Sequence, residues 1–198
     1  MSWQWITEEI GYLPATQEPL SADVGLIHTK NRAWLFDVGC TDDMMRQIEA
    51  IAEEKWVVLS HFHPDHIGNL DHMQYDALYG GAFTCKKIGK GIVVAGDLYL
   101  EDKVHLFPIP SAHAKGCVGL EYGGYAFLGD ALYPAQKASG LVYNVSLLAQ
   151  QIKVLEKLQA EQFFISHKVP ALRSKTAVIT WLETVYSKRV PGQTYLPW

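Results

Sequence analysis

The residues best suited to chemistry lie close together in the first half of the chain. His61, His63, Asp65 and His66 bring three imidazoles and one carboxylate into six consecutive positions. Neutral imidazole and carboxylate are the ligands that suit zinc, iron and manganese. The pattern His-x-His-x-Asp-His therefore predicts a metal site. A polar surface loop that is merely rich in histidine is the weaker alternative, because three histidines at this spacing are rare by chance.

The local sequence indicates how these side chains are positioned. Residues 56–59 form a short apolar, partly β-branched run that predicts a buried strand ending just before His61. His61 and His63 are two positions apart, so in an extended chain both point to one side. Pro64 has no N–H and a fixed φ, which ends the strand. Asp65 and His66 then lie in the following turn or first helical residues, where they converge with the two histidines.

The motif resembles the signature of the metallo-β-lactamase-fold superfamily. This resemblance implies an α/β protein, a four-layer αββα sandwich of two mixed β-sheets flanked by helices, with a metal pair at one edge. It also implies three further ligands downstream, each after a strand: a histidine, an aspartate and a histidine.

The chain has all three of these residues in the implied order. His113 follows the predicted strand at 104–107, Asp130 follows 125–128, and His167 follows 163–165. Two departures from the family pattern lie beside them: Ala114 replaces the usual threonine, and Ser166 and Lys168 replace two glycines. The resemblance covers about residues 24–168.

The resemblance implies a dinuclear centre. Its ligands to the first metal would be His61, His63 and His113, its ligands to the second Asp65, His66 and His167, and its bridging carboxylate Asp130. Two divalent ions are expected, with zinc favoured and manganese or iron left open. Two cations about 3.5–4 Å apart lower the pKa of a shared water toward about 7, and the hydroxide can attack a carbonyl or phosphoryl centre. Asp65 is placed to orient this hydroxide and pass on its proton.

This implies a metal-dependent hydrolase with a small ester-like substrate, either a thioester or a lactone. Lactamases of the superfamily carry Cys or Ser at the position of Asp130, and the residues after His167 are too few for the helical domain of glyoxalase II. Lactonases have a tyrosine at the spacing of Tyr133 that steadies the substrate carbonyl, so Tyr133 is a second catalytic candidate, with plain packing as the alternative. A phosphodiesterase, an iron-dependent dioxygenase and a non-catalytic metal-binding module remain alternatives.

Asp37 is a candidate for orienting the site from below. It stands in the turn Asp37-Val38-Gly39 after a predicted strand. In the family, the corresponding aspartate lies beneath the metals. The alternative is an aspartate that only forms the turn.

Composition predicts one domain over residues 1–198, because this length can bury one substantial core. The net charge of −4 offers no basic footprint for nucleic acid. Three scattered cysteines, no visible signal peptide and no long apolar run predict a cytoplasmic protein with no membrane contact. The expected partner is a small-molecule substrate. A homodimer is left open, because aromatic residues occur near both termini.

Periodicity and turn residues predict the remaining elements. Helices are expected at 41–54, 144–160 and 174–188, and a strand at 162–165. Hairpins are expected at 24–36, 83–95, 97–107 and 118–128. Lys86, Lys87 and Lys90 would lie on the second of these hairpins, where a solvated face is a better interpretation than a phosphate site.

Overall fold

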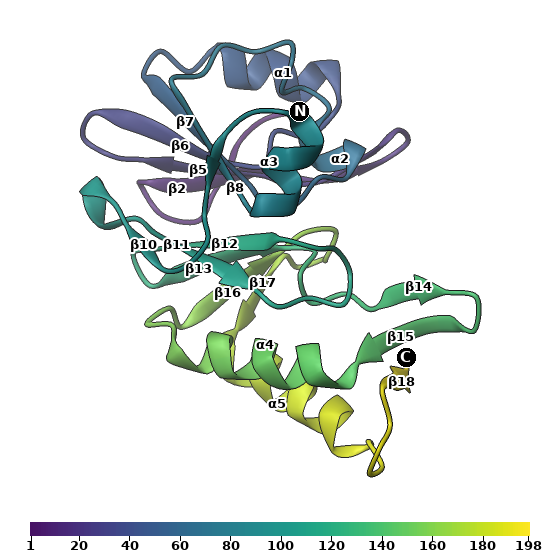
Figure 1. Ribbon diagram of the computed structural model, residues 1–198. Coiled ribbons are helices and arrows are strands. Elements are labelled where there is room, and N and C mark those ends of the chain that lie inside the picture. The colour runs from purple at the N-terminus through teal and green to yellow at the C-terminus, as the bar shows by residue number, and fades with distance from the viewer.

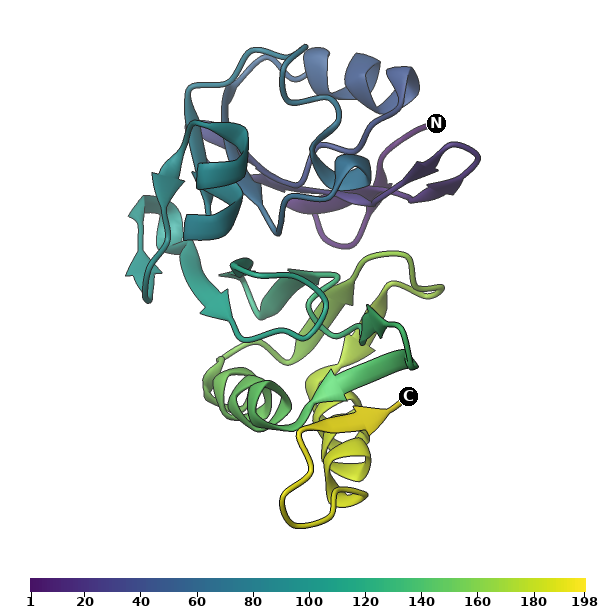
Figure 2. The ribbon, with the colours of Figure 1, turned by 45° about the vertical axis from the view of Figure 1, so that its right-hand side comes forward.

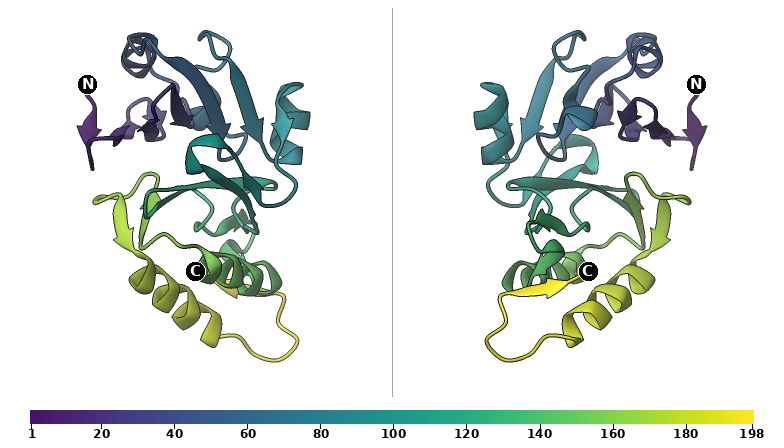
Figure 3. Two further views of the ribbon diagram at one scale, coloured as in Figure 1. Left: turned by 90° about the vertical axis from the view of Figure 1, so that its left-hand side faces the viewer. Right: turned by 90° about the vertical axis from the view of Figure 1, so that its right-hand side faces the viewer.

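The computed structural model describes residues 1–198, and its two large sheets pack face to face with helices on both outer sides (Figure 1). Figure 3 shows the same layers from two sides. The predicted four-layer αββα architecture is confirmed. In spatial order, the first sheet contains β1 (Gln4–Trp5), β2 (Ile10–Leu13), β5 (Val24–His28), β6 (Arg32–Phe36), β7 (Glu54–Leu59), β8 (Ala77–Gly80) and β9 (Ile92–Val93).

The second sheet and two small sheets complete the strands. In spatial order, the second sheet contains β10 (Leu98–Tyr99), β11 (His105–Ile109), β12 (Cys117–Tyr122), β13 (Tyr125–Gly129), β16 (Gln162–Ile165) and β17 (Leu172–Ser174). A three-stranded sheet is formed by β14 (Ala135–Lys137), β15 (Gly140–Asn144) and β18 (Tyr195–Pro197), and a two-stranded ribbon by β3 (Thr16–Gln17) and β4 (Leu20–Ser21). Figure 2 shows β18, the last strand of the chain, beside β15.

Parallel pairs in both large sheets explain why distant residues meet at one edge. Strands β6, β7 and β8 run parallel, with Phe36 opposite Val58 and Leu59 opposite Gly80. In the second sheet β13 and β16 run parallel, with Gly129 opposite Ile165. The carboxyl ends of parallel strands lie at the same edge. Segments that follow β7, β13 and β16 are therefore brought together.

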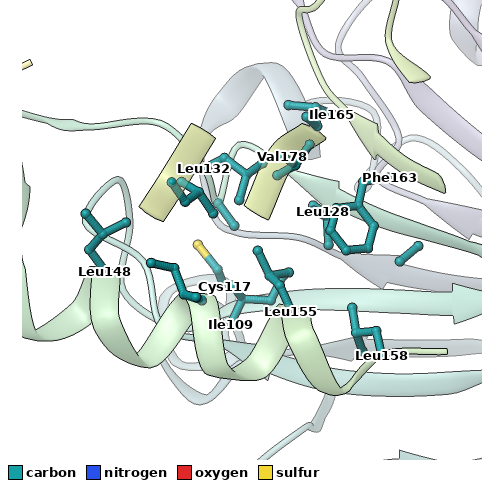
Figure 4. Packing of buried hydrophobic residues seen from close by; sticks show 14 of the residues in the cluster. Ile109, Cys117, Leu128, Leu132, Leu148, Leu155, Leu158, Phe163, Ile165 and Val178 are labelled. Atoms are coloured by element: carbon teal, nitrogen blue, oxygen red, sulfur yellow. The ribbon is translucent and has the colours of Figure 1, made fainter. Parts of the chain in front are cut away.

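Three apolar clusters hold the layers together. Phe36 and Phe127 meet between the two sheets, with ring centroids 5.7 Å apart. On the outer face of the first sheet, Met44 and Ile48 of α1 (Asp42–Glu49) are fully buried. The third cluster lies between the second sheet and the helices α4 (Val145–Lys157) and α5 (Lys175–Ser187) (Figure 4).

The predicted helix starts are confirmed by their capping hydrogen bonds. Thr41, Asn144 and Ser174 accept hydrogen bonds from backbone N–H groups in the first turns of α1, α4 and α5, respectively. The predicted end of the first helix at 54 is wrong, because the chain leaves the helix at Ala50 and enters β7 at Glu54. Ile51 is buried as a loop residue, so its apolar character reflects packing and not helical periodicity.

The predicted hairpin at 83–95 is also wrong. Residues Ala82–Ile88 form helix α3, and the chain pairs only later, as β9 against β8. Gly89 ends the helix with a positive φ of 76°, and its N–H donates to the Cys85 carbonyl. Thr84 and Cys85 form the buried side of this helix. Tertiary packing therefore decides the structure of a segment that is too short for its periodicity to be read. The remaining helical turns are α2 (Pro64–Ile67) and η1 (Glu101–Lys103).

Among the helices, none has the length and apolar character needed to cross a membrane.

The cluster beneath α4 and α5 yields a stability prediction. Leu155 is fully buried in it, whereas Lys153 on the same helix is exposed. Leu155→Ala should lower the free energy of unfolding by about 2–5 kcal/mol, because it removes buried methyl groups and leaves a cavity. Lys153→Ala should change it by less than about 0.5 kcal/mol. Denaturant unfolding followed by circular dichroism measures both, and equal effects would contradict the packing described here.

Candidate metal centre

The predicted ligands come together at one edge of the two sheets, from four separate segments. Strand β7 ends at Leu59, and His61 follows it as a fully buried residue. His63 is the N-cap of α2, so Asp65 and His66 fall in its first turn, as expected. His113 lies in the loop between β11 and β12. Asp130 follows β13 directly, and His167 lies two residues beyond β16.

These side chains form two adjacent groups whose donor atoms could each hold an ion. Within each group, one ligand atom per residue lies within 4.8 Å of all the others. The first group contains His61, His63 and His113; the second contains Asp65, His66, Asp130 and His167. In the first group, His113 Nε2 lies 3.2 Å from His63 Nδ1. In the second, Asp65 Oδ2 lies 3.1 Å from His167 Nε2 and 3.4 Å from His66 Nε2.

The carboxylate of Asp130 stands between the two groups. Its Oδ2 atom lies 3.4 Å from His66 Nε2 and 3.5 Å from His113 Nε2, and its Oδ1 atom lies 3.9 Å from His167 Nε2. It therefore touches histidines of both groups. This is the position that the resemblance implied for a bridging carboxylate.

The donor atoms are suited to a cation. Nε2 of His61, Nε2 of His66 and Oδ1 of Asp130 are buried and have no hydrogen-bond partner within the protein. Buried polar atoms are costly unless they are paired or coordinate a metal. The imidazole and carboxylate donors therefore fit divalent transition metals such as zinc, manganese or iron.

The comparisons with known proteins agree with this geometry. A sequence profile described as "Metallo-beta-lactamase superfamily" matches residues 18–75, which include the His-x-His-x-Asp-His motif. A comparison with curated proteins finds no match.

Solved structures with the same fold cover nearly the whole chain. A metallo-β-lactamase from Erythrobacter litoralis is 17% identical with a TM-score of 0.67, and the alignment covers 94% of this chain and 96% of that one. The mono-zinc form of the metallo-β-lactamase FIM-1 from Pseudomonas aeruginosa is 14% identical with a TM-score of 0.70, covering 94% and 95% of the two chains. A flavo di-iron protein from Thermotoga maritima is 12% identical with a TM-score of 0.67, covering 93% of this chain and 61% of that one.

The chain has the metallo-β-lactamase fold.

The pKa values of the donor side chains differ between the two groups. Burial, assisted by the neighbouring imidazoles, lowers the pKa of His61 far below its usual range. Burial also lowers the pKa values of His63 and His113. The first group is therefore three neutral imidazoles at pH 7, the protonation state in which histidine binds a metal.

In the second group, the pKa shifts favour the charged forms of the side chains. Burial alone would lower the pKa of His66, but the Asp37 and Asp130 carboxylates outweigh it and raise that pKa to about 10. Burial opposes ionisation of Asp65 as well, yet the hydrogen bond with His167 lowers its pKa. The same contact raises the pKa of His167 against the effect of burial. Carboxylates thus favour positive charge at this group.

Asp37 and Ser60 orient two of the histidines. Asp37 is fully buried, and its carboxylate accepts hydrogen bonds of 2.7 Å each from the Ser60 N–H, the Ser60 hydroxyl and His66 Nδ1. Because the hydroxyl donates to Asp37, it accepts from His61 Nδ1, 3.0 Å away. Both imidazoles therefore carry their proton on Nδ1 and present Nε2 to the centre, the arrangement typical of metal-binding histidines. The structure thus places Asp37 beneath the site, where the resemblance implied it.

Two positioning residues were not identified from the sequence. Asp23 is buried and accepts hydrogen bonds from the N–H groups of His167 (2.9 Å) and Ala15 (3.0 Å). It holds His167 in the left-handed conformation, with φ of 60°. Ser111 accepts from the His113 N–H and donates to the Ala131 carbonyl. Asp23 carries no local signal, because it precedes His167 by 144 residues. Ser111 lies only two residues before His113, but its contact with the Ala131 carbonyl forms only in the folded chain.

Gly129 is required where the two sheets approach each other beneath Asp130. Its φ is +53°, and a Cβ atom there would lie 2.5 Å from the Ser60 Cβ. Any side chain would therefore push Asp130 away from the motif after β7.

Tyr133 lies beside the centre with its hydroxyl already engaged. The hydroxyl donates to the Ser166 carbonyl at 2.7 Å, and the ring centroid lies 6.0 Å from that of His113. Burial raises the pKa of this phenol well above its usual value, so the group is a neutral donor at pH 7. His72 is exposed and belongs to neither group of donor atoms.

The centre opens into a cleft of about 520 Å³. His63, Asp65, His113, Asp130 and His167 line its floor, together with Tyr133, Leu141 and Lys168. Its volume is within the range of small-molecule sites.

The buried hydrogen bonds of Asp37 lead to a prediction about metal affinity. Asp37→Asn should weaken zinc binding by about 10- to 100-fold, because an amide cannot accept all three hydrogen bonds and the two imidazoles lose their orientation. Competition with a chromophoric chelator measures the affinity, and circular dichroism checks the fold. Asp71→Asn, at an exposed aspartate, is the matched control. Unchanged affinity would leave Asp37 with only its turn-forming role.

Proposed function

We propose that this protein is a dinuclear metal-dependent hydrolase that acts on a small ester-like substrate, a thioester or a lactone. The observation that carries the proposal is the position of Asp130, whose carboxylate contacts histidines of two donor groups. A mononuclear site would need only one of these groups. The open cleft above them supports a small-molecule substrate.

The proposed ligand assignment follows the two groups. The first ion would be held by His61, His63 and His113, the second by Asp65, His66 and His167, with Asp130 shared between them. Zinc is the proposed ion, because neutral imidazoles and carboxylates are among its usual ligands. Manganese and iron fit the same donors.

Such ions, when bound, supply Lewis acidity and water that is acidic enough to ionise near neutral pH. The protein contributes orientation and proton transfer. Asp65 is ionised at pH 7, because the contact with His167 lowers its pKa. Its carboxylate can therefore accept a hydrogen bond from the attacking water and carry a proton to the leaving group.

Asp130 also bears on the choice of reaction. A carboxylate at this position, in place of the Cys or Ser of the lactamases, supports esters over β-lactams. The three cysteines are unpaired, which supports the cytoplasm as the proposed compartment.

Turnover of a substrate panel tests the proposal. In a panel of a glutathione thioester, several lactones and a phosphodiester, metal-loaded protein should hydrolyse the thioester or a lactone and not the phosphodiester. Elemental analysis should find two ions per chain. Asp65→Ala should lower kcat by about 100-fold or more, because it removes both a proposed ligand of the second ion and the proton-transferring group. His72→Ala is the control, since His72 is exposed and outside the centre.

Other outcomes would point elsewhere. Two bound ions with no turnover of any class would contradict hydrolysis of ester-like bonds. One bound iron with oxygen consumption would favour a dioxygenase, and a chain that binds no metal would contradict the enzyme proposal.

We also propose Tyr133 as the donor that steadies the substrate carbonyl. Its neutral hydroxyl would exchange its bond to Ser166 for one to the substrate. Tyr133→Phe should then lower kcat for the best lactone by about 100-fold with little change in KM, as expected for loss of a donor to a developing oxyanion. Steady-state kinetics measures this. A fall in unfolding free energy of about 1 kcal/mol with unchanged kcat would assign Tyr133 to packing alone.

A further inference from the structure

A second groove, of about 730 Å³, leaves the metal centre on the side of the three histidines. It shares four lining residues with the cleft: His63, His113, Pro134 and Leu141. The two spaces are therefore adjacent. A molecule that reacts at the centre can extend into this groove.

The groove is positively charged, although the whole chain is acidic. Its lining includes Lys115 and Lys137 and contains no aspartate or glutamate. The net charge of the chain is −4. Neither lysine forms an ion pair within the protein. Lys90, by contrast, pairs with Asp71 on the surface. Unpaired ammonium groups in a concave surface attract anions.

Aromatic rings accompany these lysines. Lys115 Nζ lies 5.9 Å from the ring centroid of Phe83, and Lys137 Nζ lies 5.6 Å from that of Tyr195. Phe83 is 38% exposed and Tyr195 is 45% exposed, so each ring still offers a face to a ligand. A third lysine, Lys87, lies 5.7 Å from the ring of Phe62.

Helix α3 and the small three-stranded sheet, which local sequence patterns did not reveal, form parts of the groove walls. Phe83 is presented by α3, in the segment expected to be a hairpin. Lys137 and Tyr195 come from β14 and β18 of the small three-stranded sheet, which joins residues far apart in the chain. Backbone pairing therefore holds Lys137 and Tyr195, whereas Lys115 lies in the loop between β11 and β12.

We infer that this groove binds a negatively charged group of the substrate, with Lys115 and Lys137 as its specificity-determining residues. The substrate class is an ester or thioester that carries a carboxylate, sulfonate or phosphate away from the bond that reacts. An apolar or aromatic part beside that anion packs on Phe83 and Tyr195. The inference depends on the proposed function only where it calls the bound molecule a substrate.

A binding experiment without turnover tests this inference. The probes are phenylmethanesulfonate and benzyl methyl sulfone, which share a ring and differ in charge; a sulfonate is also a weak metal ligand. NMR titration of the metal-loaded protein should give tighter binding of the sulfonate, and raising the salt from 20 mM to 500 mM should reduce the difference. The double variant Lys115→Gln/Lys137→Gln should weaken sulfonate binding by about three- to tenfold, and sulfone binding by less than twofold.

Matched controls keep the test decisive. Lys115→Arg/Lys137→Arg should retain sulfonate binding, because the charges are kept. Lys30→Gln should have no effect, because Lys30 is exposed in the turn between β5 and β6, at the end of the sheet opposite the centre. Equal affinity of the wild-type protein for the two probes would overturn the inference, even if the double variant failed to fold. So would a loss of sulfonate binding in Lys30→Gln as large as in the double variant.

A kinetic arm separates this inference from the proposed function. If a thioester is hydrolysed, the double variant should raise KM for 2-(acetylthio)ethanesulfonate and not for 2-(acetylthio)ethanol, with kcat for both retained. Charge-selective binding without hydrolysis would uphold the groove and contradict the hydrolase. Hydrolysis with no charge selectivity would support the hydrolase and contradict the anion-binding groove.

Discussion

The buried junction at Ser60 is the constraint on which the candidate centre depends. Its N–H and hydroxyl both donate to Asp37, its carbonyl accepts from the Val118 N–H at 2.9 Å, and its Cβ fits only against a glycine at position 129. One residue thus joins the ends of β6 and β7 to strands β12 and β13 of the other sheet. Because unpaired buried polar groups are costly, this network permits few alternative arrangements. The network around Ser60 therefore also fixes where the histidines that follow it lie.

The distribution of charge in the centre also favours the binding of cations. Three neutral imidazoles lie beside a group that carries the carboxylates of Asp65 and Asp130, with Asp37 beneath it. Carboxylates that raise the pKa of His66 show that positive charge is favoured there. Metal ions would supply that charge while displacing the proton. Metal binding is therefore expected to be coupled to pH and to the stability of this edge of the sandwich.

The fold alone does not decide the reaction. The structural neighbours include metallo-β-lactamases and a flavo di-iron protein, all below 20% identity, so the likeness extends to the architecture only. The features of this chain that bear on the reaction lie around the candidate centre: Asp130 between the two groups, the hydroxyl of Tyr133, and a groove in which Lys115 and Lys137 have no acidic partners. These features bear on the substrate, and they come from loops and short strands that differ readily between proteins of one fold.

Elements with strong local signals could be predicted before the structure was known. The apolar run of β7 and the capping residues of the three long helices were predictable, because periodicity and caps act over a few residues. The order of the seven proposed ligands was implied by the resemblance to the metallo-β-lactamase-fold superfamily. Features that depend on contacts between distant residues required the three-dimensional structure. It made α3 a helix where a hairpin was expected, paired β18 with β15, and set Asp23 beneath His167. Packing and long-range hydrogen bonds override weak local propensity in short segments, so no pattern within those segments could show the groove that they build.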